Sequence, residues 1–319
     1  MVGLTPSAMP LTTNDNFMAL TIYNIKKWYR MLTGKSVLHV NQNLGKTFAV
    51  GQLTGYYNNL TEKVTMLPEL LQTDGLPTLH TEKGEDVFFP VAIFQYGLGA
   101  YDLYLQTGDK TYLRKFMQCG EWAMSHQQDN GAWNNFFYVY PSAPYGAMAQ
   151  GEGASLLLRA YAQTHDKRYK DAARMAIDFM LRPICEGGTS SYAHGAICLH
   201  EYTHLPVVLN GFVFAWWGLY DYSLVDDSHT YDKFLQQSLR GMRELLPRFS
   251  NSYWSLYDLG GKIASPFYHN LHIAQMEAMF LITGDSAFKH YADKWKGDQG
   301  NSLKHALAFT RKAIQKILE

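Results

Sequence analysis

Residues able to move protons or hold a metal gather in the second half of this chain. The run His200-Glu201-Tyr202-Thr203-His204 matches HExxH, a pattern in which two imidazoles bind zinc. The pattern functions only on a helix, where residues four apart share one face. Pro206 follows at once and disfavours the helical conformation at Leu205. We therefore expect no catalytic zinc, with a structural metal on these histidines and His194 as the alternative.

Other groups suited to acid–base chemistry or sugar binding follow in the next segment of the chain. Tyr257 and Asp258 lie together, and Tyr268 precedes His269 and His272. Aromatic residues make up 14% of the chain. Flat rings can fill a core or pack against the apolar faces of sugars, so both roles are open.

A recurring phrase predicts the helices that position these residues. Phrases similar to Tyr-Leu-Gln-Thr-Gly-Asp end at Asp109, Asp166, Asp227 and Asp285. In each case an apolar stretch with helical spacing precedes the phrase and a more charged one follows it. The Gly or His and the Asp predict a tight turn and the cap of the next helix. A period of about 60 residues with two helices is typical of an α/α toroid.

The apolar stretches predict buried inner helices and the amphipathic stretches an outer ring. The expected inner helices are Pro90–Leu105, Gln150–Ala162, Leu205–Tyr222 and Asn270–Leu281. The expected outer helices are Tyr112–Ser125, Tyr169–Leu181, Tyr231–Leu246 and Phe288–Trp295. Two more, Asn14–Leu32 and Ser302–Leu318, are expected to close the ring.

We therefore predict a mainly α protein: an α/α toroid, either incomplete or a six-hairpin barrel, in one domain spanning residues 1–319. Alternating residues over 36–60 predict a small N-terminal β appendage such as a short hairpin. Loops that return from outer to inner helices share one face of such a ring. The long return loops Asp129–Pro144, Cys185–Leu205 and Ser250–Ser265 therefore predict a single functional site.

Composition excludes several other classes of protein. Lys plus Arg and Asp plus Glu both number 28, and this balance argues against a nucleic-acid binder. No stretch approaches the ~20 apolar residues of a membrane span. Three scattered cysteines and a start without a signal-peptide pattern lead us to expect a cytoplasmic protein. There is no GxGxxG or P-loop motif, so we expect no nucleotide cofactor.

Six short segments resemble, in order, the C-terminal catalytic domain of D-glucuronyl C5-epimerases. They include Phe-Pro-Val-Ala-Ile-Phe-Gln-Tyr-Gly-Leu (89–98), Ala-Met-Ala-Gln-Gly-Glu (147–152) and Glu-Tyr (201–202) with Val-Leu-Asn-Gly-Phe (208–212). The others are Gly-Leu-Tyr-Asp (218–221), Leu-Tyr-Asp-Leu (256–259) and Tyr-His-Asn-Leu-His-Ile-Ala-Gln (268–275). Together they define an epimerase-like core over about residues 88–297.

The resemblance implies an α/α barrel enzyme that converts glucuronate to iduronate in heparan-type chains without a cofactor. It implies catalytic roles for Glu201, Tyr202, Tyr257 and Tyr268. It also implies a glucuronate-bearing oligo- or polysaccharide as substrate and offers a homodimer as a candidate assembly. The chain departs from the family at Gly260, where the family tends to carry an arginine that could bind the substrate carboxylate.

Epimerisation at C5 removes a proton α to a carboxylate and returns one from the other face. We expect Glu201, with Tyr202, to act on one face and Tyr268 on the other. Tyr257 and a neighbouring histidine would bind the carboxylate. A tyrosine suits this chemistry only if a nearby positive charge lowers its pKa, and His269 and His272 are the candidates to supply that charge. The expected substrate-binding residues are Gln150, Asn210, His269, His272, Trp133 and Tyr96.

Three alternative functions stay open at this level. A uronate lyase would form the same carbanion and expel the C4 oxygen. A glycoside hydrolase would need two opposed carboxylates, for which Glu201 and Asp258 are available. A non-catalytic glycan-binding protein would use the same aromatic site without chemistry.

Overall fold

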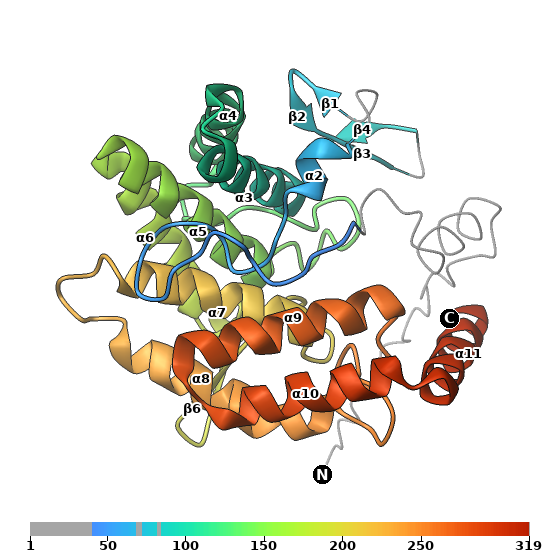
Figure 1. Ribbon diagram of the computed structural model, residues 1–319. Coiled ribbons are helices and arrows are strands. Elements are labelled where there is room, and N and C mark those ends of the chain that lie inside the picture. The colour runs from blue at the N-terminus through green and yellow to red at the C-terminus, as the bar shows by residue number, and fades with distance from the viewer. Residues whose placement is uncertain (1–39, 68–71, 82–83, 319) are drawn as a thin grey trace, which may run out of the picture.

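The computed structural model describes residues 40–67, 72–81 and 84–318. Helical hairpins dominate this part of the chain (Figure 1). The four hairpins are α3 (Pro90–Thr107) with α4 (Lys110–His126), α5 (Ala147–Thr164) with α6 (Lys167–Leu181), α7 (Leu209–Ser223) with α8 (Asp232–Leu245), and α9 (Pro266–Thr283) with α10 (Ser286–Gly300). The helix α11 (Ser302–Leu318) follows them. The predicted mainly α fold is confirmed.

The recurring phrase forms the turn between the helices of each hairpin, as predicted. Gly108 ends α3 in the left-handed conformation, with φ 72°. The Asp109 side chain then accepts a hydrogen bond from the Thr111 N–H at 2.7 Å and caps α4. His165 and Asp166 repeat this arrangement between α5 and α6. The third turn is longer, since α7 ends at Ser223 and α8 begins only at Asp232.

The inner and outer assignment of the helices is also confirmed. The inner helices α3, α5, α7 and α9 are apolar around their circumference and largely buried, and α5 packs against both α3 and α7. The outer helices have one apolar face each. In the described residues the four hairpins form an incomplete toroid, the first of the two predicted forms. The expected helix Asn14–Leu32 lies outside the described residues.

Residues 40–60 cross the inner helices (Figure 1) and are hydrogen-bonded to each of the four. Thr47 and the Tyr56 N–H both donate to Asp102 of α3, at 2.8 and 2.9 Å. The Tyr57 hydroxyl donates to Asp221 of α7, and Asn43 accepts from Asn270 of α9. The segment was expected to form strands. In its described part the two arms run antiparallel and share a few backbone hydrogen bonds, such as that from the Gly45 N–H to the Tyr57 carbonyl, but they form one isolated bridge, Leu44 with Asn58, and no named strand.

Short strands occur elsewhere. β1 (Gln72–Thr73) pairs with β2 (Leu76–Pro77), and β3 (Leu79–His80) with β4 (Asp86–Val87). These two-residue pairs supply a small β element ahead of α3. A third pair, β5 (Ser190–Ala193) with β6 (Ala196–Leu199), lies in the return loop between α6 and α7 and leads into Glu201.

A buried ion pair fixes the inner helices near the hairpin turns. Arg159 of α5 and Asp221 of α7 are 2.6 Å apart, and both side chains are fully buried. Arg159 also donates to the carbonyls of Thr54 and Gly55, so its charge is well solvated by protein groups. Arg159 thus joins α5, α7 and residues 40–60 in the interior of the protein.

Candidate active site

The return loops place Glu201 and Tyr257 beside the first turns of inner helices. The Ala147 N–H at the start of α5 donates to the His200 carbonyl at 2.7 Å. The Leu209 N–H at the start of α7 donates to the Tyr257 carbonyl at 3.1 Å. Because these bonds use helix-start N–H groups that have no partner within the helix, each loop is held at the mouth of the inner helices.

Tyr268 joins them from the first turn of α9. Ser265 caps this helix by accepting a hydrogen bond from the Tyr268 N–H at 3.4 Å. The rings of Tyr257 and Tyr268 meet edge to face with centroids 4.9 Å apart. The four residues expected to be catalytic therefore meet in one place, although they come from three segments of the chain.

Glu201 has the properties expected of a general base. Its side chain is buried, and burial raises its pKa to about 7. Tyr202 donates a hydrogen bond to the carboxylate, while Oε2 has no partner in the described part of the chain. An acceptor oxygen buried without a partner is available to a ligand. A carboxylate with a pKa near neutrality can both take and return a proton.

The three tyrosines form a hydrogen-bonded series that leads away from Glu201. Tyr202 bonds to Glu201, Tyr257 bonds to Tyr202, and Tyr268 bonds to Tyr257. Burial raises the pKa of each phenol, and the nearby Glu201 carboxylate raises it further. The expectation that their pKa values would be lowered was therefore wrong. Neutral phenols suit these residues to act as proton donors.

The positive charge expected from two histidines is absent for the same reason. Burial lowers the pKa of both His269 and His272 to about 3, so both imidazoles are neutral at pH 7. His269 stacks on Trp254 with ring centroids 3.6 Å apart, and both of its nitrogens bond to protein, Nδ1 to Ser255 and Nε2 to the Trp295 carbonyl. It has no nitrogen left for a sugar. His272 bonds to Ser255 through Nδ1, while its Nε2 has no partner within the ranges that the structure describes.

Gln150 and Trp133 were expected to bind substrate, but they bond to each other. The Gln150 amide accepts from the Trp133 N–H and donates to the Trp133 carbonyl, both at 3.0 Å. The Trp133 indole N–H donates to the Ala123 carbonyl, and its ring packs on Phe94. These two residues attach a return loop to α5, so the structure gives them a supporting role.

Tyr96 also lies away from the site. Its ring is buried between α3 and α4, and its hydroxyl accepts a hydrogen bond from Lys115 of α4 at 2.9 Å. Tyr96 lies on the side of α3 that faces α4, so its side chain points toward the outer helices. Asn210 differs, because it lies next to the Gly211–Glu201 contact in α7 and its buried Oδ1 has no hydrogen-bond partner among the described residues.

Sequence reasoning missed a set of polar residues on the inner helices. Gln95 of α3 donates to Glu152 of α5 at 2.8 Å, and Gln275 of α9 donates to the Asn210 carbonyl at 3.2 Å. Burial, with a smaller contribution from the nearby Glu201, raises the pKa of Glu152 to about 8. The available signal was a polar side chain within an otherwise apolar helix. Phe136, whose ring stacks on Tyr202 at 4.6 Å, carried no such signal.

The HExxH segment is not helical, in agreement with the effect expected of Pro206. His200 bonds to Ser191 through Nε2, and the His204 ring packs on Tyr140. In the part of the chain that the structure describes, no three His, Cys, Asp or Glu side chains are grouped to hold a metal. Asp258 accepts from the Lys262 N–H at 3.1 Å and so stabilises its own turn.

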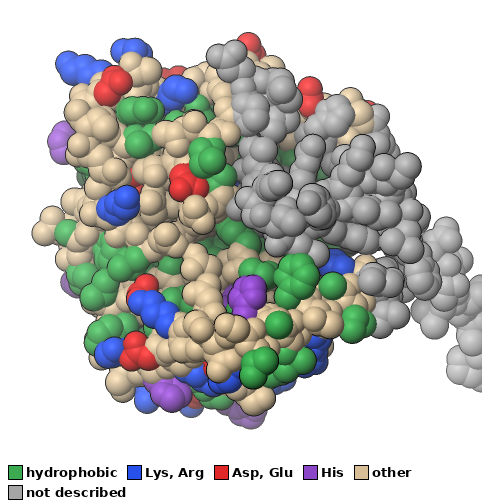
Figure 2. Space-filling model, turned by 45° about the vertical axis from the view of Figure 1, so that its right-hand side comes forward, with side chains coloured by type: hydrophobic (Ala, Val, Ile, Leu, Met, Phe, Trp, Pro, Cys, Tyr) green, Lys and Arg blue, Asp and Glu red, His purple; other side chains and the backbone are tan. Residues whose placement is uncertain are grey.

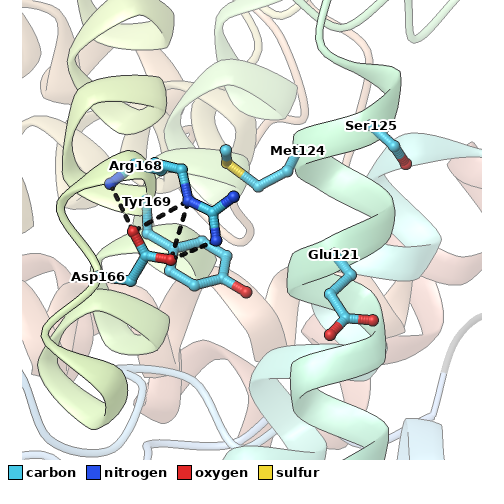
Figure 3. A pocket seen from close by; sticks show the side chains of 6 residues that line it. All are labelled: Glu121, Met124, Ser125, Asp166, Arg168 and Tyr169. Carbon is cyan, nitrogen blue, oxygen red and sulfur yellow. Dashed lines mark hydrogen bonds and ion pairs between the residues drawn. The ribbon is translucent and has the colours of Figure 1, made fainter.

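A shallow depression elsewhere on the surface does not belong to this site. It lies between the outer helices α4 and α6 and is lined by Glu121, Met124, Tyr169 and the ion pair of Asp166 with Arg168 (Figure 3). Arg168 is largely exposed and is paired with Asp166, the capping residue of α6.

On the face drawn in Figure 2, the basic side chains are interspersed with acidic ones. None of the described helices is long and apolar enough to cross a bilayer.

Comparison with known proteins agrees with this arrangement. The family model described as D-glucuronyl C5-epimerase C-terminus matches residues 118–297, more than half of the chain. The chain belongs to this family. The matched segment runs from α4 to α10 and includes Glu201, Tyr202, Tyr257 and Tyr268. It leaves out α3, residues 40–60 and α11.

Two curated relatives are similar over part of their length. A D-glucuronyl C5-epimerase of Caenorhabditis elegans is 28% identical over 220 residues, which cover 60% of this chain and 36% of that protein. An uncharacterized protein of Methanocaldococcus jannaschii is 29% identical over 157 residues, covering 47% of this chain and 51% of that one. The chain thus spans about a third to a half of these relatives.

Solved structures of similar fold include cellobiose 2-epimerases. The one from Bacillus thermoamylovorans B4167 has a TM-score of 0.49 and 12% identity, covering 84% of this chain and 67% of that one. The one from Spirochaeta thermophila DSM 6192 has a TM-score of 0.47 and 10% identity, covering 91% of this chain and 79% of that one.

Proposed function

We propose that this protein is an epimerase that inverts C5 of glucuronate residues in a glycan and yields iduronate without a cofactor. The observation that carries the proposal is Glu201, whose unpartnered carboxylate oxygen lies beside a series of neutral phenols. Membership in the C5-epimerase family supports the reaction type. A glucuronate-bearing oligo- or polysaccharide is the proposed substrate.

In the proposed mechanism, Glu201 removes the C5 proton and becomes a neutral carboxylic acid. The electron pair left at C5 delocalises into the substrate carboxylate and gives an enediolate. Tyr268 returns a proton to C5 from the opposite face. The series of Tyr268, Tyr257, Tyr202 and Glu201 offers the two groups a hydrogen-bonded path for exchanging protons between turnovers.

Neutral phenols serve this reaction better than ionised ones. A phenolate beside the substrate would add a third negative charge where the enediolate already carries two. A neutral phenol donates a hydrogen bond to the developing charge and then a proton to carbon. The raised pKa of Tyr268 therefore favours the role of acid, with Glu201 as the base.

The test is incubation with heparosan oligosaccharides in D2O, with deuterium at C5 and iduronate both measured by NMR. Enzyme equilibrated in D2O has a deuterated Tyr268 hydroxyl, so epimerisation introduces deuterium at C5. We expect exchange and iduronate without chain cleavage. An ultraviolet-absorbing unsaturated uronate would indicate a lyase, and binding without any exchange would indicate a glycan-binding protein.

A further inference from the structure

Two amide side chains of the inner helices are buried and each keeps an oxygen that accepts no hydrogen bond. Asn210 lies in the first turn of α7 and is 3% exposed, and Gln275 lies in α9 and is fully buried. Neither Oδ1 of Asn210 nor Oε1 of Gln275 has a hydrogen-bond partner in the part of the chain that the structure describes. Because buried polar atoms normally have a partner, these two oxygens indicate donors that come from outside the protein.

The two amides are connected to one another and to the proposed catalytic groups. Nε2 of Gln275 donates to the Asn210 backbone carbonyl at 3.2 Å. The residue after Asn210 is Gly211, which packs against the Glu201 carboxylate. Gln275 follows Tyr268 by seven residues, nearly two full turns, so both side chains project from the same side of α9. The amides therefore lie beside the proposed base, on helices that also place the proposed acid.

The chemistry of these oxygens selects the kind of ligand group that they can bind. The bond to the Asn210 carbonyl fixes the orientation of the Gln275 amide, because only its nitrogen can donate, and Oε1 is then the end that is left over. A carbonyl oxygen of an amide accepts hydrogen bonds and carries no net charge. It therefore suits a hydroxyl group and adds no repulsion to a substrate that already bears a carboxylate.

An internal glucuronate of heparosan offers two hydroxyl donors, at C2 and C3, because its C1 and C4 oxygens are in glycosidic bonds and its carboxylate and ring oxygen only accept. We infer that Asn210 and Gln275 each accept a hydrogen bond from one of these two hydroxyls and so hold the pyranose ring with C5 at Glu201. The inference rests on the proposed function and deepens it, since it names the substrate groups that the inner helices recognise. A ring held in this way keeps the C5 proton within reach of the base.

The test measures, by calorimetry, binding of a heparosan tetrasaccharide and of two synthetic analogues that contain 2-deoxyglucuronate or 3-deoxyglucuronate. The proteins are wild type, Asn210→Ala, Gln275→Met and Gln150→Met. Asn210→Ala removes the side-chain oxygen and leaves the backbone carbonyl to Gln275. Gln150→Met is the matched control, because Gln150 is also a fully buried inner-helix glutamine but its amide oxygen is bonded to the Trp133 N–H. Thermal unfolding shows whether each variant is folded, and Asn210→Ala alone decides the test if Gln275→Met is not.

We expect wild type and Gln150→Met to bind each deoxy analogue at least about tenfold more weakly than the parent, because the analogue leaves a buried acceptor unpaired. Asn210→Ala should lose this discrimination against one analogue and Gln275→Met against the other. Equal binding of all three sugars by wild type would show that the two oxygens hold water only, and it would overturn the inference. A folded Asn210→Ala or Gln275→Met variant that keeps both discriminations would overturn it too. A wild type that discriminates but exchanges no C5 proton would overturn the proposed function alone.

Discussion

Glu201 packs directly against Gly211 of α7. A methyl group at position 211 would lie 2.3 Å from Oε2 of Glu201 and 2.6 Å from its Cβ. The glycine thus provides the space in which the carboxylate is buried, and its position in the first turn of α7 places that space at the mouth of the inner helices.

Gly211→Ala should therefore displace Glu201 and reduce C5 exchange by at least about 100-fold, since small misplacements of a catalytic group are costly. The matched control is Gly297→Ala in α10, where an added methyl group meets nothing within 4 Å. That variant should keep full activity and gain roughly 0.5–1 kcal/mol of unfolding free energy from helix propensity. Equal activity of the two variants would contradict the placement of Glu201.

Tyr268→Phe should abolish turnover while leaving the fold intact, because it removes the proposed acid and keeps the ring. We expect a loss of about 100-fold or more, the size typical of general acid–base groups. Deuterium incorporation at C5 measures it, with Tyr104→Phe near the hairpin turn of α3 as the control. Near-normal exchange would remove Tyr268 from the mechanism.

The dependence of kcat/KM on pH should report the ionisation of Glu201. Burial raises its pKa to about 7. The ionised fraction of Glu201 therefore increases with pH, and activity should rise about tenfold between pH 6 and pH 8. Tyr202 lowers this pKa by its hydrogen bond. Tyr202→Phe should therefore move the rise to higher pH. A shift to lower pH would show that the bond favours the protonated acid.

Glu152 should make the fold less stable as pH rises. Burial raises its pKa to about 8 in the folded state, above the ordinary value of 4.5. The folded protein then binds more protons than the unfolded chain between these values, so stability is lost as pH climbs toward 8. Glu152→Gln should raise the unfolding free energy at pH 8 and have little effect at pH 5. Urea denaturation measures this, and Glu244→Gln at an exposed pair should show no such dependence.

Arg159→Met should destabilise the protein by about 3–5 kcal/mol, because it leaves the buried Asp221 carboxylate without its partner. The control is Arg168→Met, which breaks a solvent-exposed pair with Asp166 and should have little effect on stability. Thermal or urea unfolding compares them. Equal effects would show that the buried pair does not hold α5 against α7.

Much of the fold was predictable because it depends on local patterns. In the Thr-Gly-Asp phrase, the glycine favours the left-handed conformation and the aspartate caps the next helix. Both properties are local, so Gly108 and Asp109 have the predicted conformations. Apolar stretches became inner helices since a helix without a polar face must be buried. The return loops identified the location of Glu201, Tyr257 and Tyr268 through the repeat alone.

What the sequence could not determine was the direction and partner of each polar side chain. Trp133 and Gln150 bond to one another, and Tyr96 faces the outer ring, because packing around the helix axis decides which way a side chain points. Residues 40–60 alternate like strands, yet their polar groups bond to the inner helices.

Charge states were likewise decided by the tertiary structure. A sequence shows that His269 and His272 stand near tyrosines, but burial makes both neutral and raises the pKa of the phenols. Desolvation depends on every neighbour in space, and most of those neighbours are distant in sequence. By itself the sequence determined the hairpins and the end of the ring where the site forms. Only the folded chain decided which of the expected residues meet there, because burial and side-chain direction depend on neighbours that are distant in sequence.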